Sequence, residues 1–255
     1  DPWITGRGRW KKALARLGYE RRSWARSRAF HALTPREGQD IERESGRRDS
    51  LIIANAGPAA APPPIAARAP LLLYLGRIHE KKNIGALIEA WIALDHCGDL
   101  PAGARLVIAG WGEPQAVGEL ERALVGAPGS IRFVGPQFGA DKARLLAEAR
   151  FVVLPSHSEG LPMVILEAWA AGTPTLMSRE CNLPAGFAAG AAIEADTGPA
   201  GLLPQLRRAL TMPDGEWLAM ASAAHDLASG PFSAKAIAAQ WEAAYAGLMQ
   251  GTTPR

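Results

Sequence analysis

The sequence predicts a doubly wound α/β domain, in which helices cover both faces of a parallel β-sheet. Three observations lead to this fold class: five short apolar runs recur from Leu71 onward, helical patterns fill the gaps between them, and glycine or polar clusters follow the runs. Strands that are apolar throughout are buried on both faces. Strands that alternate with helices form parallel neighbours in a single sheet.

The predicted elements follow one another along residues 71–249. The strands are LLLYL at 71–75, RLVIA at 105–109, IRFV at 131–134, FVVLP at 151–155 and PTLMS at 174–178. Helical spacing predicts helices near 84–95, 114–125, 140–149 and 162–172, and then near 199–211, 214–228 and 233–249. The sequence has no internal repeat.

Composition divides the chain into four segments. Residues 1–57 are basic and largely helical in pattern, 58–70 form a Pro/Ala-rich linker, 71–232 form the α/β domain, and 233–250 form a last helix. The basic character belongs to the front, because residues 1–50 hold 13 Lys and Arg against 7 Asp and Glu, whereas the totals are 28 and 25. A linker is expected where prolines prevent regular structure.

Composition also excludes several classes of protein. Hydrophobic residues make up 48% and charged residues 21%, as in folded globular proteins. No apolar run reaches the roughly 18 residues of a membrane span. Cys97 and Cys181 form no disulfide framework, so a reducing cytoplasmic compartment is expected. The histidines lack metal-ligand spacing and no Asp-x-Asp occurs, so no metal is expected. Nucleic acid is not an expected partner.

Residues 9–30 have the pattern of a basic amphipathic helix. Trp10, Leu14, Leu17 and Trp24 recur at near-helical spacing among arginines and lysines. Such a helix can cover a neighbouring domain with its apolar stripe, or it can make peripheral contact with an anionic membrane surface. The pattern leaves both alternatives open.

The unusual residues of the α/β domain cluster after the predicted strands. The clusters are Gly76-Arg77, Gly110-Trp111-Gly112, Gly135-Pro136 and the loop 156–160. In a doubly wound sheet, ligands bind beyond the carboxyl ends of the strands, where strand order reverses. If the order is 3-2-1-4-5-6, the reversal brings Arg77 and Lys82 opposite the loop that holds Glu159. We take Gly110 and Gly112 as turn and close-approach glycines and His157 as a structural loop residue.

The helix after the fourth strand carries the most specific chemistry. We expect it to begin at Pro162, whose fixed φ suits a first helical position, and to end at Gly172. Its members are apolar except Glu167, so it is expected to be buried on nearly all sides, with Trp169 in the core. Between Glu159 and Glu167, free N–H groups at a positive helix terminus suit a phosphate. A carboxylate, an anion site and a second carboxylate match a nucleoside diphosphate sugar.

The segment SEGLPMVILEAWAAGTP resembles the retaining glycosyltransferases of the large family four, which have two Rossmann-like halves in the GT-B architecture. GRIHEKKNIGALIEAW at 76–91 resembles the diphosphate motif of this family, and RLVIAGWGEP and IRFVGP resemble its second- and third-strand signatures. The resemblance covers about 71–249. It implies that Glu159 contacts the donor sugar and Glu167 the ribose. The backbone of Gly160, Leu161, Pro162, Met163 and Val164 would serve the sugar and phosphates, and that of Phe133 and Val134 the base.

The resemblance also implies a mechanism and partners. Arg77, Lys82 and Glu159 would be catalytic, in a metal-independent retaining transfer from a UDP-sugar or GDP-sugar to an acceptor glycan or glycolipid. Relatives build lipopolysaccharide or other surface polysaccharide at the inner membrane face, so a cytoplasmic or peripheral location is expected. No Asp or Glu is placed as a double-displacement nucleophile, and the resemblance implies that the acceptor hydroxyl attacks on the same face as the departing diphosphate.

Departures from the family pattern bear on activity. Asn83 stands where glycine is frequent, and IANAG at 53–57 replaces P-N-G. Residues 1–57 resemble only the end of the first half, so we interpret the chain as a fragment that lacks the sheet and pocket for the acceptor. The alternative function is a truncated, non-catalytic nucleotide-sugar-binding or interaction module. A dinucleotide-dependent oxidoreductase is disfavoured, because GRIHEKK at the first strand turn is no dinucleotide fingerprint.

Overall fold

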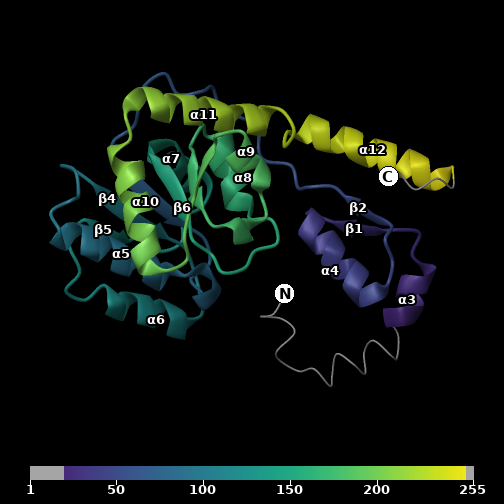
Figure 1. The fold of residues 1–255 in the computed structure, drawn as a ribbon, viewed down its shortest axis with the longest axis horizontal. Coiled ribbons are helices and arrows are strands. Elements are labelled where there is room, and N and C mark those ends of the chain that lie inside the picture. The colour runs from purple at the N-terminus through teal and green to yellow at the C-terminus, as the bar shows by residue number, and fades with distance from the viewer. Residues whose placement is uncertain (1–19, 251–255) are drawn as a thin grey trace. The chain divides into compact units, whose positions relative to one another are not determined.

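The computed structural model describes residues 20–250 and divides the chain into two compact units (Figure 1). The larger unit comprises Ala56–Ser233. The smaller comprises the chain up to Asn55 together with the chain from Ala234 onward. Each unit is described by itself below.

A six-stranded parallel sheet forms the centre of the larger unit. Its order is β5 (Ile131–Phe133), β4 (Arg105–Ala109), β3 (Leu71–Leu75), β6 (Phe151–Leu154), β7 (Thr175–Met177) and β8 (Ala192–Glu194). The five predicted strands are confirmed, and so is the order 3-2-1-4-5-6. Strand β8 is additional; it has three residues, one of them buried, so it lacks the continuous apolar run that marks β3, β4 and β6.

Helices cover both faces of this sheet (Figure 1). Helix α5 (Ile84–His96) packs against α6 (Pro114–Ala123) and α10 (Pro199–Thr211). Helix α8 (Met163–Ala170) packs against α7 (Gly139–Glu148) and α11 (Asp214–Ser229), and α11 also contacts α9 (Pro184–Ala188). The predicted helices are therefore confirmed within a few residues. Among residues 20–250, no helix is long and apolar enough to cross a bilayer.

Apolar strands and three tryptophans fill the core. Alternate residues of β3 and β4, such as Leu73 and Val107, pack with Leu145 of α7 and Ala168 of α8. The indole N–H of each fully buried tryptophan has an acceptor: Trp91 donates to Ser130 Oγ at 3.0 Å, Trp169 to Thr175 Oγ1 at 3.3 Å and Trp217 to the Arg150 carbonyl at 2.8 Å. These bonds offset the desolvation that an unpaired buried N–H would suffer. The expected core position of Trp169 is confirmed.

The predicted linker has no helix or strand, but it is fastened to the larger unit. The Ala61 N–H donates to the Ala170 carbonyl at 2.7 Å. Arg68 donates to the carbonyls of Ala149 and Ala171 at 2.9 and 2.7 Å, at the ends of α7 and α8, and to Thr173 Oγ1 at 2.5 Å. Burial lowers the pKa of Arg68 to about 10. Segment 58–70 is therefore part of the larger unit, attached to it by hydrogen bonds.

The smaller unit contains a short β-α-β arrangement. Strands β1 (Phe30–Ala32) and β2 (Ser50–Ile52) pair in parallel, and α4 (Pro35–Ser45) connects them. Thr34 Oγ1 accepts from the Glu37 N–H at 3.2 Å at the start of α4, and Gly46 ends the helix in a left-handed conformation. The expectation of a helical front without a sheet is therefore wrong, because two strands are present. These strands were missed because each has only one buried residue, without the continuous apolar pattern of β3 or β6.

Most of the basic helix predicted over 9–30 lies outside the described residues. Within them, α3 (Arg21–Arg26) is helical, and β1 begins at Phe30. The last helix, α12 (Ala234–Met249), belongs to the same unit and carries Trp241, whose ring lies 4.7 Å from that of His31 in β1.

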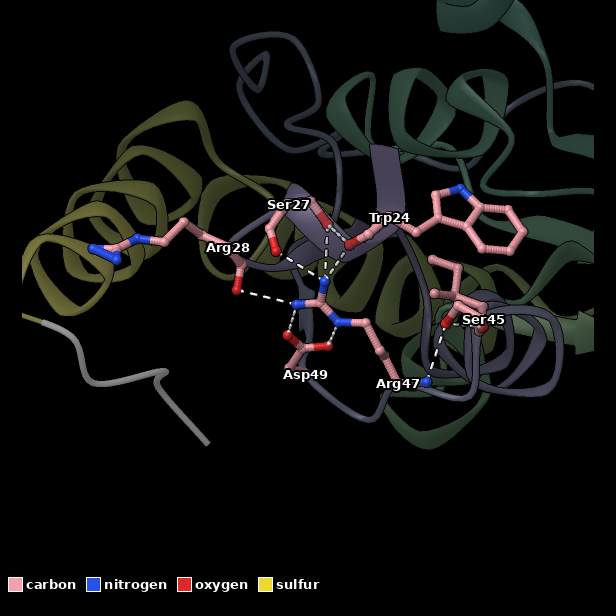
Figure 2. Close-up of polar contacts among 7 residues, drawn as sticks. Trp24, Ser27, Arg28, Ser45, Arg47 and Asp49 are labelled. Carbon is pink, nitrogen blue, oxygen red and sulfur yellow. Dashed lines mark hydrogen bonds and ion pairs between the residues drawn. The ribbon is translucent and has the colours of Figure 1, made fainter. Parts of the chain in front are cut away.

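Arg47 holds the end of α3 against the segment that follows α4. Figure 2 shows its guanidinium pointing at the backbone of the α3 terminus, where Nη1 donates to the carbonyls of Trp24 at 2.5 Å and Ser27 at 2.8 Å. Arg47 Nε also donates to Asp49 Oδ1 at 2.9 Å, and this hydrogen bond lowers the pKa of the Asp49 carboxyl. One arginine therefore adds donors to carbonyls at a helix end, where the carbonyls lack intrahelical partners, and the Trp24 carbonyl also accepts from Ser27 Oγ at 2.8 Å.

Candidate functional site

The loops after β3, β4, β5 and β6 meet at the carboxyl edge of the parallel sheet. Strand order reverses between β3 and β6, which are direct neighbours. The loop after β3 holds Arg77 and Lys82, and the loop after β6 holds Glu159. Ligands bind at this point in doubly wound sheets.

Glu159 and Lys82 form an ion pair across the switch point, the place between β3 and β6 where strand order reverses. Lys82 Nζ lies 2.5 Å from Glu159 Oε1, and the two side chains are 22% and 9% exposed. Ser156 Oγ donates to the same carboxylate oxygen at 2.7 Å. The predicted approach of Lys82 to the Glu159 loop is confirmed. Ser156 belongs to the predicted loop 156–160, but its contact with Glu159 was not predicted.

Backbone contacts fasten the β6–α8 loop to its neighbours on both sides. The His157 N–H donates to the Lys81 carbonyl at 2.8 Å, and Asn83 Nδ2 donates to the Pro155 carbonyl at 3.1 Å. On the other side, Asn182 Nδ2 donates to the Glu159 carbonyl at 2.7 Å. Asn83 and Asn182 both have a left-handed φ, which asparagine tolerates better than most residues. Asn83 therefore meets the conformation for which glycine is frequent and adds a bond that glycine lacks.

Arg77 turns toward the loop after β4. Its Nη2 lies 3.3 Å from Glu113 Oε1, and its guanidinium carbon lies 5.5 Å from the centre of the Trp111 ring. The Arg77 carbonyl accepts from Tyr74 Oη at 2.7 Å. Burial, followed by the charge of Glu159, raises the pKa of Tyr74 well above its ordinary value. Arg77 thus lies at the predicted edge, but its polar side-chain partner is Glu113 instead of a group on the β6 loop.

Glycines allow the loops after β3 and β4 to touch. A Cβ on Gly110 would lie 1.8 Å from the Gly76 carbonyl oxygen, and one on Gly112 would lie 2.5 Å from the Ile78 carbonyl oxygen. The Ile78 N–H donates to the Trp111 carbonyl at 2.7 Å, beside a parallel bridge between Ile78 and Gly112. The prediction that Gly110 and Gly112 permit close approach is confirmed.

The start of α8 presents backbone N–H groups beside Glu159. Pro162 lies just before the helix, with φ −74° and ψ 113°, so the predicted start is one residue early. Within residues 20–250, the N–H groups of Met163 and Val164 have no acceptor, as expected in a first helical turn. The expectation that the helix is buried on nearly all sides is wrong at this end, because Met163 is 38% exposed. Leu161 and Pro162 are buried and anchor the loop, and Gly160 is exposed.

Glu167 has a partner that the sequence did not indicate. Lys142 Nζ of α7 lies 2.7 Å from Glu167 Oε1, and both side chains are partly exposed. A carboxylate on an otherwise apolar helix is costly without such a partner. Because α7 and α8 are distant in sequence, only tertiary packing pairs these two residues.

Strand β5 is one of the two lateral edge strands of the sheet, the other being β8. Val134 has both backbone groups occupied, since its N–H donates to the Ile108 carbonyl at 3.0 Å and its carbonyl accepts from Gln137 Nε2 at 3.0 Å. Alternate residues of an edge strand face opposite directions. The N–H and carbonyl of Phe133 therefore point toward the open edge, while those of Val134 do not.

Three large apolar side chains in the segments after β4 and β5 are exposed. Trp111 is 53% exposed and Phe138 69%, and Val134 is exposed as well. The sequence pattern did not single out Phe138, which precedes α7. Among the described residues, no group of three or more His, Cys, Asp or Glu side chains could hold a metal ion.

The family model that matches the chain is described as "Glycosyl transferases group 1", and it covers residues 69–212, more than half of the sequence. The chain belongs to this family. The matched span contains the sheet edge and every side chain of the site described above.

Similar proteins support this membership in the glycosyltransferases. The chain is 32% identical over 200 residues to a GDP-mannose-dependent alpha-(1-6)-phosphatidylinositol dimannoside mannosyltransferase of Mycobacterium tuberculosis. The aligned region covers 77% of this chain and 48% of that protein. It is 35% identical over 113 residues to a lipopolysaccharide core biosynthesis glycosyltransferase of Rhizobium meliloti, covering 44% of this chain and 31% of that protein. The chain therefore spans about half, or less, of the length of these relatives.

Solved structures share the fold. HepE of Anabaena, crystallised with UDP and glucose, matches with a TM-score of 0.73 and 18% identity, covering 87% of this chain and 64% of that one. WaaG, a glycosyltransferase involved in lipopolysaccharide biosynthesis, matches with a TM-score of 0.62 and 21% identity, covering 90% of this chain and 68% of that one. These likenesses place the larger unit among Rossmann-like halves of GT-B glycosyltransferases.

Proposed function

We propose that this chain binds a nucleoside diphosphate sugar and forms the donor half of a retaining, metal-independent glycosyltransferase. The observation that carries the proposal is the order of groups along the β6–α8 segment. Glu159 comes first, then the acceptor-free N–H groups of Met163 and Val164, and then Glu167. Sugar hydroxyls, diphosphate and ribose hydroxyls occur in the same order in the ligand.

Two cations beside these groups support a phosphate site without metal. Lys82 is paired with Glu159 but has three N–H donors, so it can bind a phosphate oxygen while it keeps this pair. Arg77 is paired with an exposed carboxylate, and such pairs contribute little. A diphosphate can therefore replace Glu113 as the partner of Arg77. Charge-assisted bonds of this kind stabilise a departing diphosphate.

The sites for ribose and base follow from the neighbouring elements. Glu167 accepts from ribose hydroxyls, and the outward backbone of Phe133 offers one donor and one acceptor to the base. The contact expected for the Val134 backbone is left out of this assignment, because its N–H and carbonyl are engaged. The mannosyltransferase relative is named for GDP-mannose and HepE was solved with UDP, so both donor bases belong in the test.

Isothermal titration calorimetry tests the donor assignment. The chain is titrated with UDP, GDP and their glucose and mannose forms, in buffer with and without EDTA. We expect one base to bind, with an affinity that EDTA does not change. Glu159→Gln should weaken the sugar nucleotide selectively, and Glu167→Gln should weaken both it and the free nucleotide. Glu121→Gln on the exposed face of α6 is the matched control. Absence of nucleotide binding by the wild-type chain would refute the proposal.

Catalysis, acceptor and location form the finer part of the proposal. The acceptor is a glycan or glycolipid of bacterial surface polysaccharide or lipopolysaccharide, reached at the cytoplasmic membrane face with residues 9–30 as a peripheral contact. A transfer assay on the chain joined to a complete first half tests catalysis, and nuclear magnetic resonance of the product tests retention. Co-sedimentation with anionic vesicles tests the membrane contact. Because the chain spans 48% of its mannosyltransferase relative, the rival is a non-catalytic binding module. Nucleotide binding without transfer would favour that rival.

A further inference from the structure

The two oxygens of the Glu159 carboxylate have different surroundings. Lys82 Nζ and Ser156 Oγ both contact Oε1, at 2.5 and 2.7 Å. Within the described part of the chain, Oε2 has no hydrogen-bond partner. One oxygen is therefore held by the protein, and the other is available to accept from a ligand hydroxyl.

Ser156 and Lys82 differ in what a bound diphosphate does to them. Lys82 is partly exposed and charged, so it shares its three N–H donors between Glu159 and a bound phosphate. Ser156 is fully buried and neutral, and its single hydroxyl proton is directed at Glu159. When Lys82 also binds a phosphate, the Ser156 hydroxyl still donates to Glu159 and keeps the carboxylate in place.

Ser156 is itself fixed by the neighbouring strands. Its carbonyl accepts from Ser178 Oγ at 2.6 Å, at the end of β7, and Ser178 is also buried. The carbonyl of the preceding residue, Pro155, accepts from Asn83 Nδ2 on the β3 side. The backbone that carries the Ser156 side chain is therefore fixed by hydrogen bonds from both the β7 side and the β3 side. Such preorganisation keeps a binding group within a fraction of an ångström of its working position.

We propose that Ser156 is a positioning residue that orients Glu159 so that Oε2 accepts from a hydroxyl of the donor sugar. The inference rests on the proposed function, because it requires a nucleoside diphosphate sugar at this edge. According to this inference, the tighter binding of a sugar nucleotide than of the free nucleotide depends on the buried Ser156 hydroxyl, which contacts neither ligand. A purely structural role for Ser156 would affect both ligands equally.

The test compares two affinities in the same variant. The 255-residue chain is titrated with the nucleoside diphosphate that binds in the calorimetric panel and with its sugar form. We expect Ser156→Ala to weaken the sugar form by about three- to tenfold, because the hydrogen bond that orients the carboxylate is lost, and to leave the free diphosphate nearly unchanged. Ser130→Ala is the matched control, since it removes the hydroxyl that accepts from Trp91 at 3.0 Å in the same domain. It should change neither affinity.

A double-mutant cycle shows whether Ser156 acts through Glu159. In a Glu159→Ala background, Ser156→Ala should cause no further loss of sugar preference. An additional loss in that background, or an equal loss of both ligands in the single variant, would overturn the inference. If Ser156→Ala does not fold by circular dichroism, Ser178→Ala is measured instead, and a selective but smaller loss is expected.

Failure of the proposed function has a different signature. A wild-type chain that binds no nucleoside diphosphate refutes that function, and the role of Ser156 falls with it. A wild-type chain that prefers the sugar form, together with a Ser156→Ala variant that keeps the full preference, refutes only the role of Ser156.

Discussion

Replacing Gly110 by alanine should separate the loops after β3 and β4. The new Cβ would lie 1.8 Å from the Gly76 carbonyl oxygen, so the two must move apart by about 1.2 Å to reach 3.0 Å, below which real Cβ contacts essentially never occur. The φ of Gly110, +157°, adds strain for a residue with a side chain. Two hydrogen bonds lie at risk, Gly76 N–H to the Ala109 carbonyl at 3.0 Å and Gly110 N–H to the Gly135 carbonyl at 2.8 Å.

The expected magnitude follows from these contacts. Overpacking costs about 1–3 kcal/mol and a disfavoured backbone conformation a similar amount, so we expect a loss of about 3 kcal/mol in the free energy of unfolding. For a domain of this size, that loss lowers the melting temperature by roughly 6–12 °C. Because Gly76 precedes Arg77, displacement of the loop should also weaken nucleoside diphosphate binding.

Thermal unfolding followed by circular dichroism measures this change against a matched substitution. Gly118 lies inside α6 with no atom within 4 Å of an added Cβ. Alanine there should raise the free energy of unfolding by about 1 kcal/mol through helix propensity alone. If Gly110→Ala melts at or above the wild-type temperature, the close approach of the two loops is wrong.

Three further outcomes are expected. Burial, and then the charge of Glu159, raises the pKa of the Cys181 thiol to about 12, so it stays protonated at pH 8, and a thiol reagent should label only exposed Cys97 until the chain unfolds. Lys142→Met should weaken nucleoside diphosphate binding several-fold, because Glu167 loses its partner at 2.7 Å. Arg68→Lys should lower the free energy of unfolding by about 2–4 kcal/mol in urea titration, because an ammonium cannot reach the several oxygens that the guanidinium spans.

Each of these outcomes has a contrary result. Labelling of both thiols in the native chain would contradict the burial of Cys181. In the unfolded chain, the rate at which Cys181 is labelled should rise with pH, because the thiolate is the reactive form. Unchanged nucleotide affinity in Lys142→Met would separate the ion pair from ligand binding. An Arg68→Lys variant as stable as wild type would show that its carbonyl contacts are replaceable.

The larger unit could be predicted from the sequence because local and global signals agree there. LLLYL and FVVLP are apolar throughout, and each begins a strand–helix step that the parallel topology requires. Strand β8 and the strands of the smaller unit have one buried residue each, so they lack the continuous burial that marks β3, β4 and β6. Their formation depends on neighbouring strands that already exist.

The charged groups of the site could be predicted, but their partners could not. Glu159 and Lys82 lie in loops after strands whose adjacency follows from the expected order, so their meeting was predictable. Lys142 reaches Glu167 from another helix, and Glu113 reaches Arg77 from another loop. Such pairings depend on helix rotation and side-chain direction, which a strand order does not specify.

These partners imply different behaviour for the two cations when an anion arrives. The Arg77–Glu113 pair is exposed, 44% and 73% by side chain, so solvent screens it and a phosphate can displace Glu113 at little cost. The Lys82–Glu159 pair is much less exposed, and its disruption would leave a nearly buried carboxylate uncompensated. Lys82 must therefore contact Glu159 and the phosphate together, whereas Arg77 can leave Glu113 and pair with the phosphate alone. Charge near the diphosphate then increases through Arg77, while Glu159 stays anchored for the sugar.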